Sequence, residues 1–393
     1  MTTGNIFSSC TDDFEKLNTS NIQVDPADLP FAAQCTEPMT YCYPPQQNMF
    51  QFWTNLTIDL YGGYFMTPNG NFTNGDMGEN RGHSGGMYEN YYLHIFNNTR
   101  RIIAQCDASG ERGLSGVMRI VQAYGTLMTT DAYGPIPYSS ILSGENEVYF
   151  EFDSQKDLYK AMLEDLSTAI TDISAMGADE IAKLKSFDCW CNGDKDLWVK
   201  IANTMKLRMA LRLSKRETEA GNAGMNLKAI ATEAAQNTLA TVNKDILIDK
   251  SLENEMWLMF NWGDCGFNAN LVTIMSGTKD PRQPLYMTLN TGDIKNEAGT
   301  TTVAANSQYL GIRFASGLPA KPNSWGNFSG WIQGNNGSSY SMPLPIMKAA
   351  EAYFLLAEAK LRWDIGSESV KNLYENGIRV SMTNELAYRG AYA

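Results

Sequence analysis

The residues best suited to chemistry in this sequence are aromatic rings that alternate with side-chain amides between residues 243 and 345. A sugar presents an apolar face of C–H groups and a rim of hydroxyls, so a flat ring can stack on the face while an amide bonds to the hydroxyls. This combination predicts a sugar-binding surface. The rings that we expect to contact a ligand are Trp257, Trp262, Phe267, Trp325, Trp331 and Tyr340.

The Gly- and Asn-rich loop between residues 67 and 86 has the same chemistry. In and beside this loop we expect Tyr64, Asn71 and Phe72 to bind the ligand. Aromatic side chains bury large areas, so a single ring more often belongs to a core than to a ligand site. The alternative that these rings form a small core beneath long loops therefore stays open.

Residues 82–86 read GHSGG and match the G-x-S-x-G motif of a nucleophile elbow. Such an elbow needs a buried strand before the serine, and an acid and then a histidine after it. The segment 69–76 reads as a polar loop, and only His94 follows Ser84. We therefore predict no catalytic serine.

Paired carboxylates are the other catalytic possibility, since two of them can hydrolyse a glycosidic bond. With 43 Asp and Glu residues, chance pairs are common. The chain also lacks the βαβ alternation of a barrel or of a dinucleotide-binding fold. We predict that the protein is not an enzyme, and a glycoside hydrolase stays the third hypothesis.

The sequence offers few residues in a spacing that would bind a metal ion. The 7 Cys form no CxxC pair and there are only 2 His, so a zinc site is not expected. Asp76 and Glu79 offer too few oxygens to predict a calcium site. We expect no metal and no cofactor, and the disulfide state of the Cys residues after Cys10 stays open. The net charge of −12 repels phosphate backbones and argues against nucleic acid.

The start of the chain resembles a lipoprotein signal. Residues 7–10 read FSSC, with two small residues before Cys10, and the acidic segment TDDFE follows. We predict that Cys10 is lipidated and anchors the protein to a membrane. The sequence has no run of about 18 apolar residues that would span a membrane as a helix.

Apolar periodicity predicts a helical scaffold that positions these residues. Residues 11–45 contain many prolines, so we expect an extended arm there. Between residues 243 and 345 helical periodicity is lost, which predicts an irregular insert of short strands and turns. The helices are expected at about 47–61, 87–104, 114–130, 154–175, 198–212, 226–236, 346–362 and from about 367.

This pattern divides the chain into an arm, residues 1–45, and a single domain, residues 46–393. The scaffold of that domain comprises about 46–242 and 346–381, and the insert carries the ligand face. Alanine-rich segments such as 349–359 would let helices approach closely, as stacked helical repeats require.

Four segments resemble the SusD/RagB family of outer-membrane lipoproteins. Residues 131–139 read DAYGPIPYS, and residues 198–212 read WVKIANTMKLRMALR. Residues 280–282 read DPR, and residues 347–360 read MKAAEAYFLLAEAK. They fall in the order found in the family, and together with the start at Cys10 they are specific.

The resemblance implies a TPR-like bundle of helical repeats with a variable ligand face. It implies a lipoprotein on the cell surface that covers a SusC-like TonB-dependent transporter in the outer membrane. The ligand is usually an oligosaccharide and in some members a peptide. The resemblance transfers no ligand-binding residue, and it assigns structural roles to Asp131, Tyr133, Pro135, Pro137, Asn203 and Arg208.

We therefore predict a mainly α, SusD-like protein that captures glycans at the cell surface and delivers them to the transporter. A peptide-binding member of the same family is the alternative. The family's domain continues beyond the helix at 373–381, whereas this sequence ends at Ala393, which leaves open that part of the domain is missing.

Overall fold

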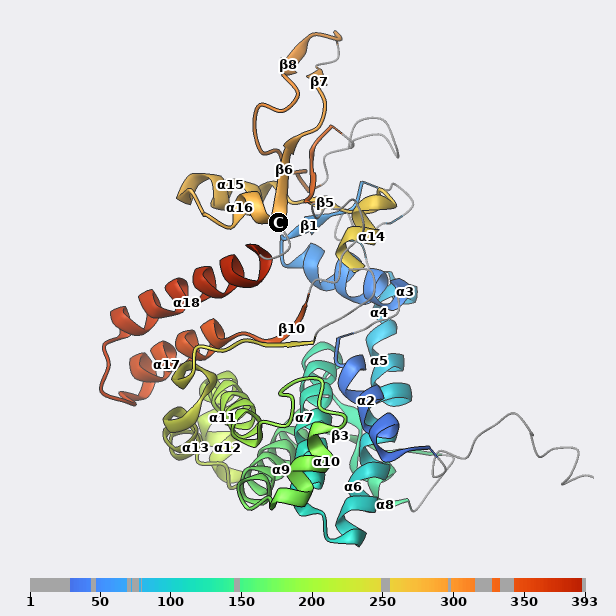
Figure 1. Cartoon of the computed structure of the whole chain (residues 1–393), viewed down its shortest axis with the longest axis vertical. Helices are drawn as coiled ribbons and strands as arrows, with labels where there is room; N and C mark the ends of the chain where they lie inside the picture. Colours follow the sequence, from blue (N-terminus) through green and yellow to red (C-terminus); the bar gives the residue numbers. More distant parts are fainter. Residues whose placement is uncertain are drawn as a thin grey trace, which may run out of the picture.

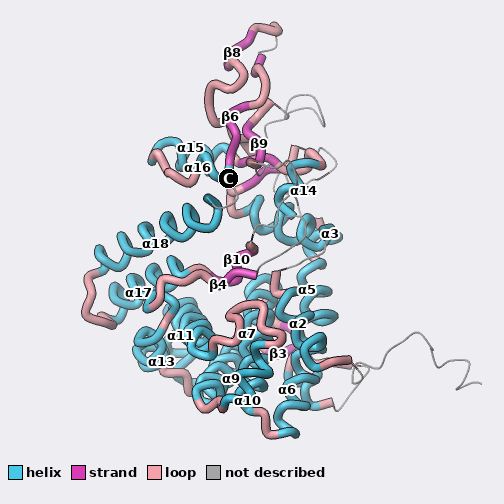
Figure 2. Tube along the Cα trace, in the orientation of Figure 1, coloured by secondary structure: helices cyan, strands magenta, loops and turns pink. Residues whose placement is uncertain are grey.

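The computed structural model describes residues 29–43, 47–68, 72, 78, 80–144, 149–248, 255–295, 298–314, 327–332 and 343–390. Figure 1 shows a larger helical part that carries a smaller part, with the strands β7 (Ile294–Lys295) and β8 (Thr301–Val303) near its tip. Helices dominate the larger part, as Figure 2 shows. Cys10 lies outside the described residues.

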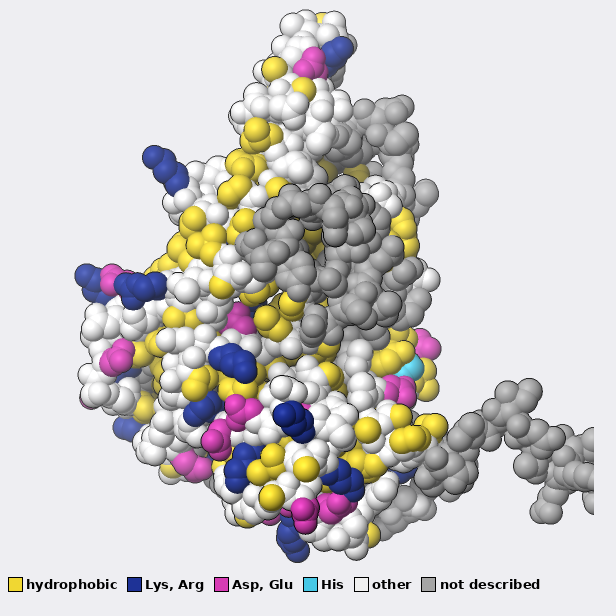
Figure 3. Space-filling view, viewed as in Figure 1, with side chains coloured by type: hydrophobic (Ala, Val, Ile, Leu, Met, Phe, Trp, Pro, Cys, Tyr) yellow, Lys and Arg dark blue, Asp and Glu magenta, His cyan; other side chains and the backbone are white. Residues whose placement is uncertain are grey.

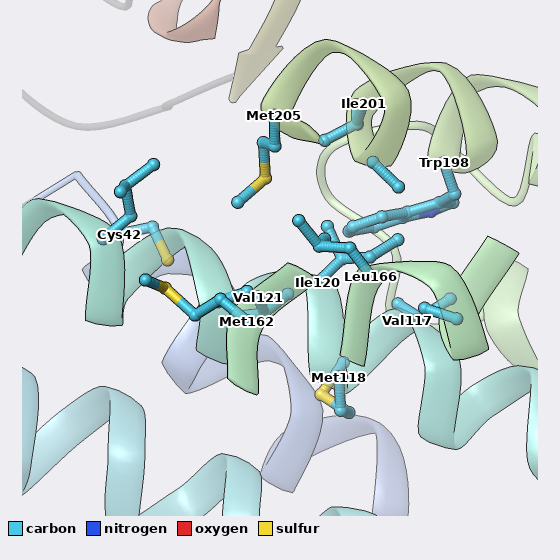
Figure 4. Packing of buried hydrophobic residues seen from close by; sticks show 14 of the residues in the cluster. Cys42, Val117, Met118, Ile120, Val121, Met162, Leu166, Trp198, Ile201 and Met205 are labelled. Carbon is cyan, nitrogen blue, oxygen red and sulfur yellow. The ribbon is translucent and has the colours of Figure 1, made fainter. Parts of the chain in front are cut away.

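The helices α7 (Arg112–Tyr133), α9 (Gln155–Ser174) and α11 (Lys195–Arg212) form the centre of the helical part. Each points an apolar face into one shared core, which Figure 4 shows from close by. Full burial of each large side chain stabilises the fold by about 1.5–3 kcal/mol. The core residues labelled there include Val117, Met118, Val121, Met162, Leu166, Trp198, Ile201 and Met205.

The helix α2 (Phe31–Tyr41) corrects the predicted extended arm. Pro38 lies inside this helix and lacks the N–H that would bond to the preceding turn. The helix nevertheless forms because Cys35 and Met39 are completely buried in the main core. The prolines indicated a weak local preference, and tertiary packing overrides it.

The N-terminal segments after α2 reach α7 mainly through η4 (Tyr91–Phe96) and α6 (Asn97–Ser109). The others are α3 (Gln47–Met49), the π-helical η2 (Phe50–Asp59), α4 (Arg81–Ser84) and α5 (Gly86–Asn90), which pack on one another, and α5 also packs on η4. Gly125 of α7 allows a close approach to η4, because a Cβ there would lie 2.8 Å from Cγ2 of Ile95. The helices predicted near 47–61 and 87–104 are therefore present, with π-helical turns.

The C-terminal helices α17 (Ala349–Trp363) and α18 (Val370–Gly390) pack against each other, and α17 also packs on α11. The contact uses small residues, since Ala349, Ala352 and Ala359 are completely buried. The predicted helix at 346–362 begins three residues later, because Ile346 belongs to the strand β10 (Leu344–Met347). That strand pairs with β4 (Ile246–Ile248).

The smaller part is built on short antiparallel pairs. The strand β1 (Phe65–Met66) pairs with β5 (Gly266–Phe267), and β6 (Met287–Asn290) pairs with β9 (Ser329–Trp331). The insert also contains helices that the sequence did not predict, namely α14 (Glu255–Asn261), α15 (Ala269–Thr278) and α16 (Gln283–Tyr286). The pairing of β1 with β5 means that the segment after η2 belongs to the smaller part as well.

The predicted fold class, a mainly α helical-repeat bundle with an irregular insert, is confirmed. No helix among the described residues is long and apolar enough to cross a membrane. The remaining elements are β2 (Ile136–Pro137), α8 (Ser139–Ser143), β3 (Phe152–Asp153), α10 (Ala178–Lys185), η5 (Leu213–Arg216), α12 (Glu217–Asn222), α13 (Leu227–Ala234), η6 (Ala235–Asn237) and η7 (Leu239–Thr241).

Asp188 organises the turn that leads into α11. One carboxylate oxygen accepts hydrogen bonds from the backbone N–H groups of Trp190 and Cys191, at 3.0 and 2.8 Å. The other accepts from the N–H of Gly193 and from the indole Nε1 of Trp198, both at 2.8 Å. The carboxylate is buried, so it fixes the position of Trp198, one of the largest side chains of the core.

We predict that Asp188→Ala lowers the free energy of unfolding by about 3 kcal/mol, because it leaves buried donors without an acceptor. Urea denaturation followed by circular dichroism measures the loss. The control is Asp179→Ala, which removes an exposed carboxylate and is expected to change stability by about 0.5 kcal/mol or less. Equal effects of the two substitutions would show that Asp188 does not have this role.

Candidate functional site

The structure places Phe267 in a core and not on a ligand surface. Only 2% of the residue is exposed, and its ring packs against Phe65, Phe260 and Trp331 with centroids 4.9–5.9 Å apart. Phe267 therefore has a packing role, where we expected a contact with the ligand. Trp331 is partly exposed and stacks on Phe267. These rings form a small core beneath the loops, and Trp331 keeps a partly exposed side.

Other predicted residues are more open. Trp262, at the end of α14, is 36% exposed, and Tyr64, before β1, is 53% exposed. Phe72 makes an edge contact with His83, with centroids 5.5 Å apart. The side chains of Trp257, Trp325, Tyr340 and Asn71 lie outside the described residues.

A cavity of about 880 Å³ lies between η2, the turn after it, α4 and the C-terminal ends of α7 and α11. Sequence reasoning missed it, because its walls come from segments that read as scaffold. The residues that line it are Trp53, Thr57, Ile58, Tyr61, Gly62, Asn80, Ser84, Leu127, Met128, Asp131, Ala132, Tyr133, Arg208 and Arg212.

The apolar wall of the cavity contains aromatic rings. Trp53 and Tyr133 stack with centroids 5.5 Å apart and ring planes 19° apart. Trp53 is buried behind the partly exposed Tyr133, while Tyr61 is 43% exposed. The indole Nε1 of Trp53 has no hydrogen-bond partner in the described part of the chain. Tyr61 and Tyr133 are therefore the rings that a ligand in the cavity can reach.

Tyr64 lies beside this cavity. A Cβ placed on Gly62, which lines the cavity, would come within 2.9 Å of Cδ2 of Tyr64. Only glycine allows the ring to approach so closely. Of the ring positions predicted from the sequence, Tyr64 is thus one that the fold brings to the edge of the cavity.

The polar wall consists of two ion pairs. The guanidinium of Arg208 binds Glu351 of α17 through two hydrogen bonds, both 2.6 Å long. Arg212 pairs with Asp131, whose other carboxylate oxygen accepts a 2.6 Å hydrogen bond from the hydroxyl of Tyr159. The cavity thus presents hydrogen-bond donors and acceptors side by side.

Tyr133 holds α4 and α5 against the end of α7. Its hydroxyl donates to the carbonyl oxygen of Ser84 and accepts from the N–H of Tyr88 at 3.3 Å. Burial raises the pKa of Tyr133 to about 12, so the hydroxyl keeps the proton that it donates. The resemblance assigned Tyr133 a structural role, and the structure adds a place in the wall of the cavity.

The G-x-S-x-G segment does not form a nucleophile elbow. It covers α4 and the start of α5, the described residues directly before the serine form no strand, and Oγ of Ser84 lies 3.5 Å from the carbonyl oxygen of Arg81. The imidazole of His83 stacks on Phe52 with centroids 4.5 Å apart, and burial lowers its pKa. The described residues also contain no group of three or more His, Cys, Asp and Glu side chains that could hold a metal ion.

The comparisons with known proteins agree on one family. A family model described as Susd and RagB outer membrane lipoprotein matches residues 15–392. A solved SusD-like protein from Bacteroides thetaiotaomicron is 26% identical, with a TM-score of 0.73 over 91% of this chain and 72% of its own. A search of curated proteins gave no significant match.

Two further solved structures are similar. A protein described as a chitin-binding SusD homolog from Flavobacterium johnsoniae is 23% identical, with a TM-score of 0.76 over 90% of this chain and 70% of its own. A SusD homolog from Bacteroides vulgatus is 25% identical, with a TM-score of 0.71 over 91% of this chain and 70% of its own.

We predict that Tyr133→Phe loosens α4 and α5, because the carbonyl oxygen of Ser84 and the N–H of Tyr88 lose a shared partner. The loss of about 1 kcal/mol should speed hydrogen exchange at the Tyr88 amide about fivefold. The control is Tyr149→Phe, since Tyr149 is 70% exposed. Unchanged exchange at Tyr88 would contradict this role.

Asp59, on η2 beside the cavity-lining Ile58, gives a pH-dependent prediction. Burial raises the pKa of its carboxyl group to about 7 from 3.8. Between about pH 4 and pH 7 the folded protein therefore holds a proton that the unfolded chain has lost, so stability should fall as the pH rises through this range. Above pH 7 the loss should stay constant.

Asp59→Asn removes this titration. We expect the substitution to stabilise the protein at pH 8 by about 1–2 kcal/mol more than at pH 5. Urea denaturation at both pH values measures the difference, with Asp179→Asn as the exposed control. Parallel pH profiles of the wild type and Asp59→Asn would refute the shifted pKa.

Proposed function

The chain belongs to the SusD/RagB family of outer-membrane lipoproteins, and on this premise we propose that it binds oligosaccharides in the cavity between η2 and the ends of α7 and α11. The observation that carries the proposal is the juxtaposition of the reachable rings of Tyr61 and Tyr133 with the pair of Arg212 and Asp131. Rings suit the C–H face of a sugar, and the ion pair suits its hydroxyls.

The size and place of the cavity support this proposal. Its volume of about 880 Å³ lies within the range of small-molecule sites and leaves room for more than one sugar ring. Tyr64 at its edge and Trp262 on the smaller part are exposed rings that could extend the surface along a longer glycan. In Figure 3 most charged side chains on this face lie over the helical part, and the smaller part carries few.

The role we propose is capture and not catalysis. Catalysis of glycoside hydrolysis needs one carboxyl group as acid and a second as base or nucleophile. Asp131 is the only carboxylate among the lining residues of the described cavity, and it is engaged by Arg212 and Tyr159. A cavity with one engaged carboxylate supports binding.

The family membership supports the cellular context that we propose. Cys10 would carry a lipid that anchors the protein to the outer membrane, with the binding cavity on the extracellular side. A SusC-like TonB-dependent transporter would receive the captured glycan. Modest affinity suits this role, because a ligand that is held very tightly cannot be passed on.

A peptide is the alternative ligand, favoured by the charged groups Arg212 and Asp131, which could meet the termini of a peptide. Both are already neutralised in a pair, so we favour the sugar. Binding of short peptides to the wild type, with no sugar able to displace them, would establish this alternative.

The test is affinity electrophoresis and calorimetry with the protein from residue 11 onward against a panel of oligosaccharides that includes chitin fragments. We expect Tyr61→Ala to weaken the affinity about tenfold, which is about 1.4 kcal/mol of lost stacking. The matched control is Tyr149→Ala, which removes an exposed ring outside the cavity and should bind as the wild type does.

Two measurements delimit the proposal. Trp262→Ala tests whether the ligand binds to the smaller part and not in the cavity. If Trp262→Ala loses affinity for the oligosaccharide and Tyr61→Ala does not, the site lies on the insert. A reducing-end assay on each ligand tests catalysis. Release of new reducing ends by the wild type would overturn the capture role.

A further inference from the structure

Each charged side chain that lines the cavity is held in an ion pair. Arg208 is bound by Glu351 through Nε and Nη2 of its guanidinium, and Arg212 is bound by Asp131. The lining residues include no other charged side chain. A ligand therefore meets dipoles and hydrogen-bonding groups, and not an uncompensated charge.

Anionic and cationic ligands are both disfavoured. A carboxylate or sulfate would have to compete with Asp131 for Arg212, which places two anions side by side at a partly buried site. A cation would face Arg208 and Arg212. The net charge of −12 further disfavours the approach of an anion.

The pair of Arg212 and Asp131 can engage a neutral ligand without being separated. Asp131 is held from behind by the hydroxyl of Tyr159 at 2.6 Å, which fixes one carboxylate oxygen. Arg212 has several N–H donors, and about half of its side chain is exposed. One donor and one acceptor that lie side by side match two adjacent hydroxyls, each of which can donate and accept.

We propose that the pair of Arg212 and Asp131 selects a neutral sugar with two adjacent free hydroxyls, which bridge the two side chains while the sugar lies against Tyr61 and Tyr133. This inference rests on the proposed function and narrows it to neutral glycans with an unsubstituted vicinal diol. Glycans in which uronic acid, sulfate or O-methyl groups occupy this position are excluded.

The experiment measures the affinity of the wild type for one oligosaccharide backbone in four forms: neutral, uronic-acid-containing, O-sulfated and O-methylated. We expect the neutral form to bind at least tenfold more tightly than each of the others. Its affinity should change less than twofold between 50 and 500 mM NaCl, since no net charge is neutralised on binding.

Substitutions then locate the selectivity. Arg212→Gln and Asp131→Asn should each weaken the neutral form about tenfold, and Asp131→Asn should reduce the discrimination against the acidic form. The matched control is Arg216→Gln, because Arg216 is exposed and does not line the cavity. Circular dichroism checks that each variant is folded, and the wild-type ranking stands as a test that needs no variant.

The outcomes separate the two proposals. If an acidic or sulfated form binds as tightly as the neutral form, or if Arg212→Gln and Asp131→Asn leave the ranking unchanged, the inference is wrong while glycan binding stands. If none of the forms binds to the folded wild type but peptides do, the proposed function fails, and this inference fails with it.

Discussion

The ion pair between Arg208 on α11 and Glu351 on α17 joins segments that are 143 residues apart. Its two 2.6 Å hydrogen bonds set the distance between the central helices and the C-terminal hairpin. Arg208 is largely buried, and removal of one partner from such a pair is costly because the remaining charge stays unpaired. Since Arg208 also lines the cavity, one contact positions both the scaffold and the binding wall.

A second polar network joins the smaller part to the helices. Nζ of Lys348, just before α17, binds Asp245 at 3.1 Å and also binds Glu385 of α18. The other carboxylate oxygen of Glu385 accepts a 2.6 Å hydrogen bond from Tyr286 of α16. In Figure 1 the end of α18 accordingly reaches the level of α16. The smaller part is thus attached by specific bonds, while its rings pack as a core of its own.

The aromatic residues have two different roles in this arrangement. Phe267 and its neighbours stabilise the short strands, which have too few backbone hydrogen bonds to stand alone. Tyr133 instead faces the cavity from the end of α7, whose position the main core fixes, and Tyr61 faces it from the turn after η2. Rings on rigid elements lose little conformational entropy when a sugar stacks on them. The polar wall, whose charges are paired, gives selectivity without tight binding.

The sequence by itself determined the helical scaffold. Apolar residues four positions apart, such as Val117 and Val121 or Ile201 and Met205, predict a helix whatever the packing of the helices against one another. The motif at 131–139 likewise indicated the family. Only the tertiary structure decided that α2 forms around Pro38 and that Phe267 is core. Nor could the sequence place Asp131 beside Arg212, since residues 81 positions apart meet only when α7 and α11 pack, and packing depends on the whole chain.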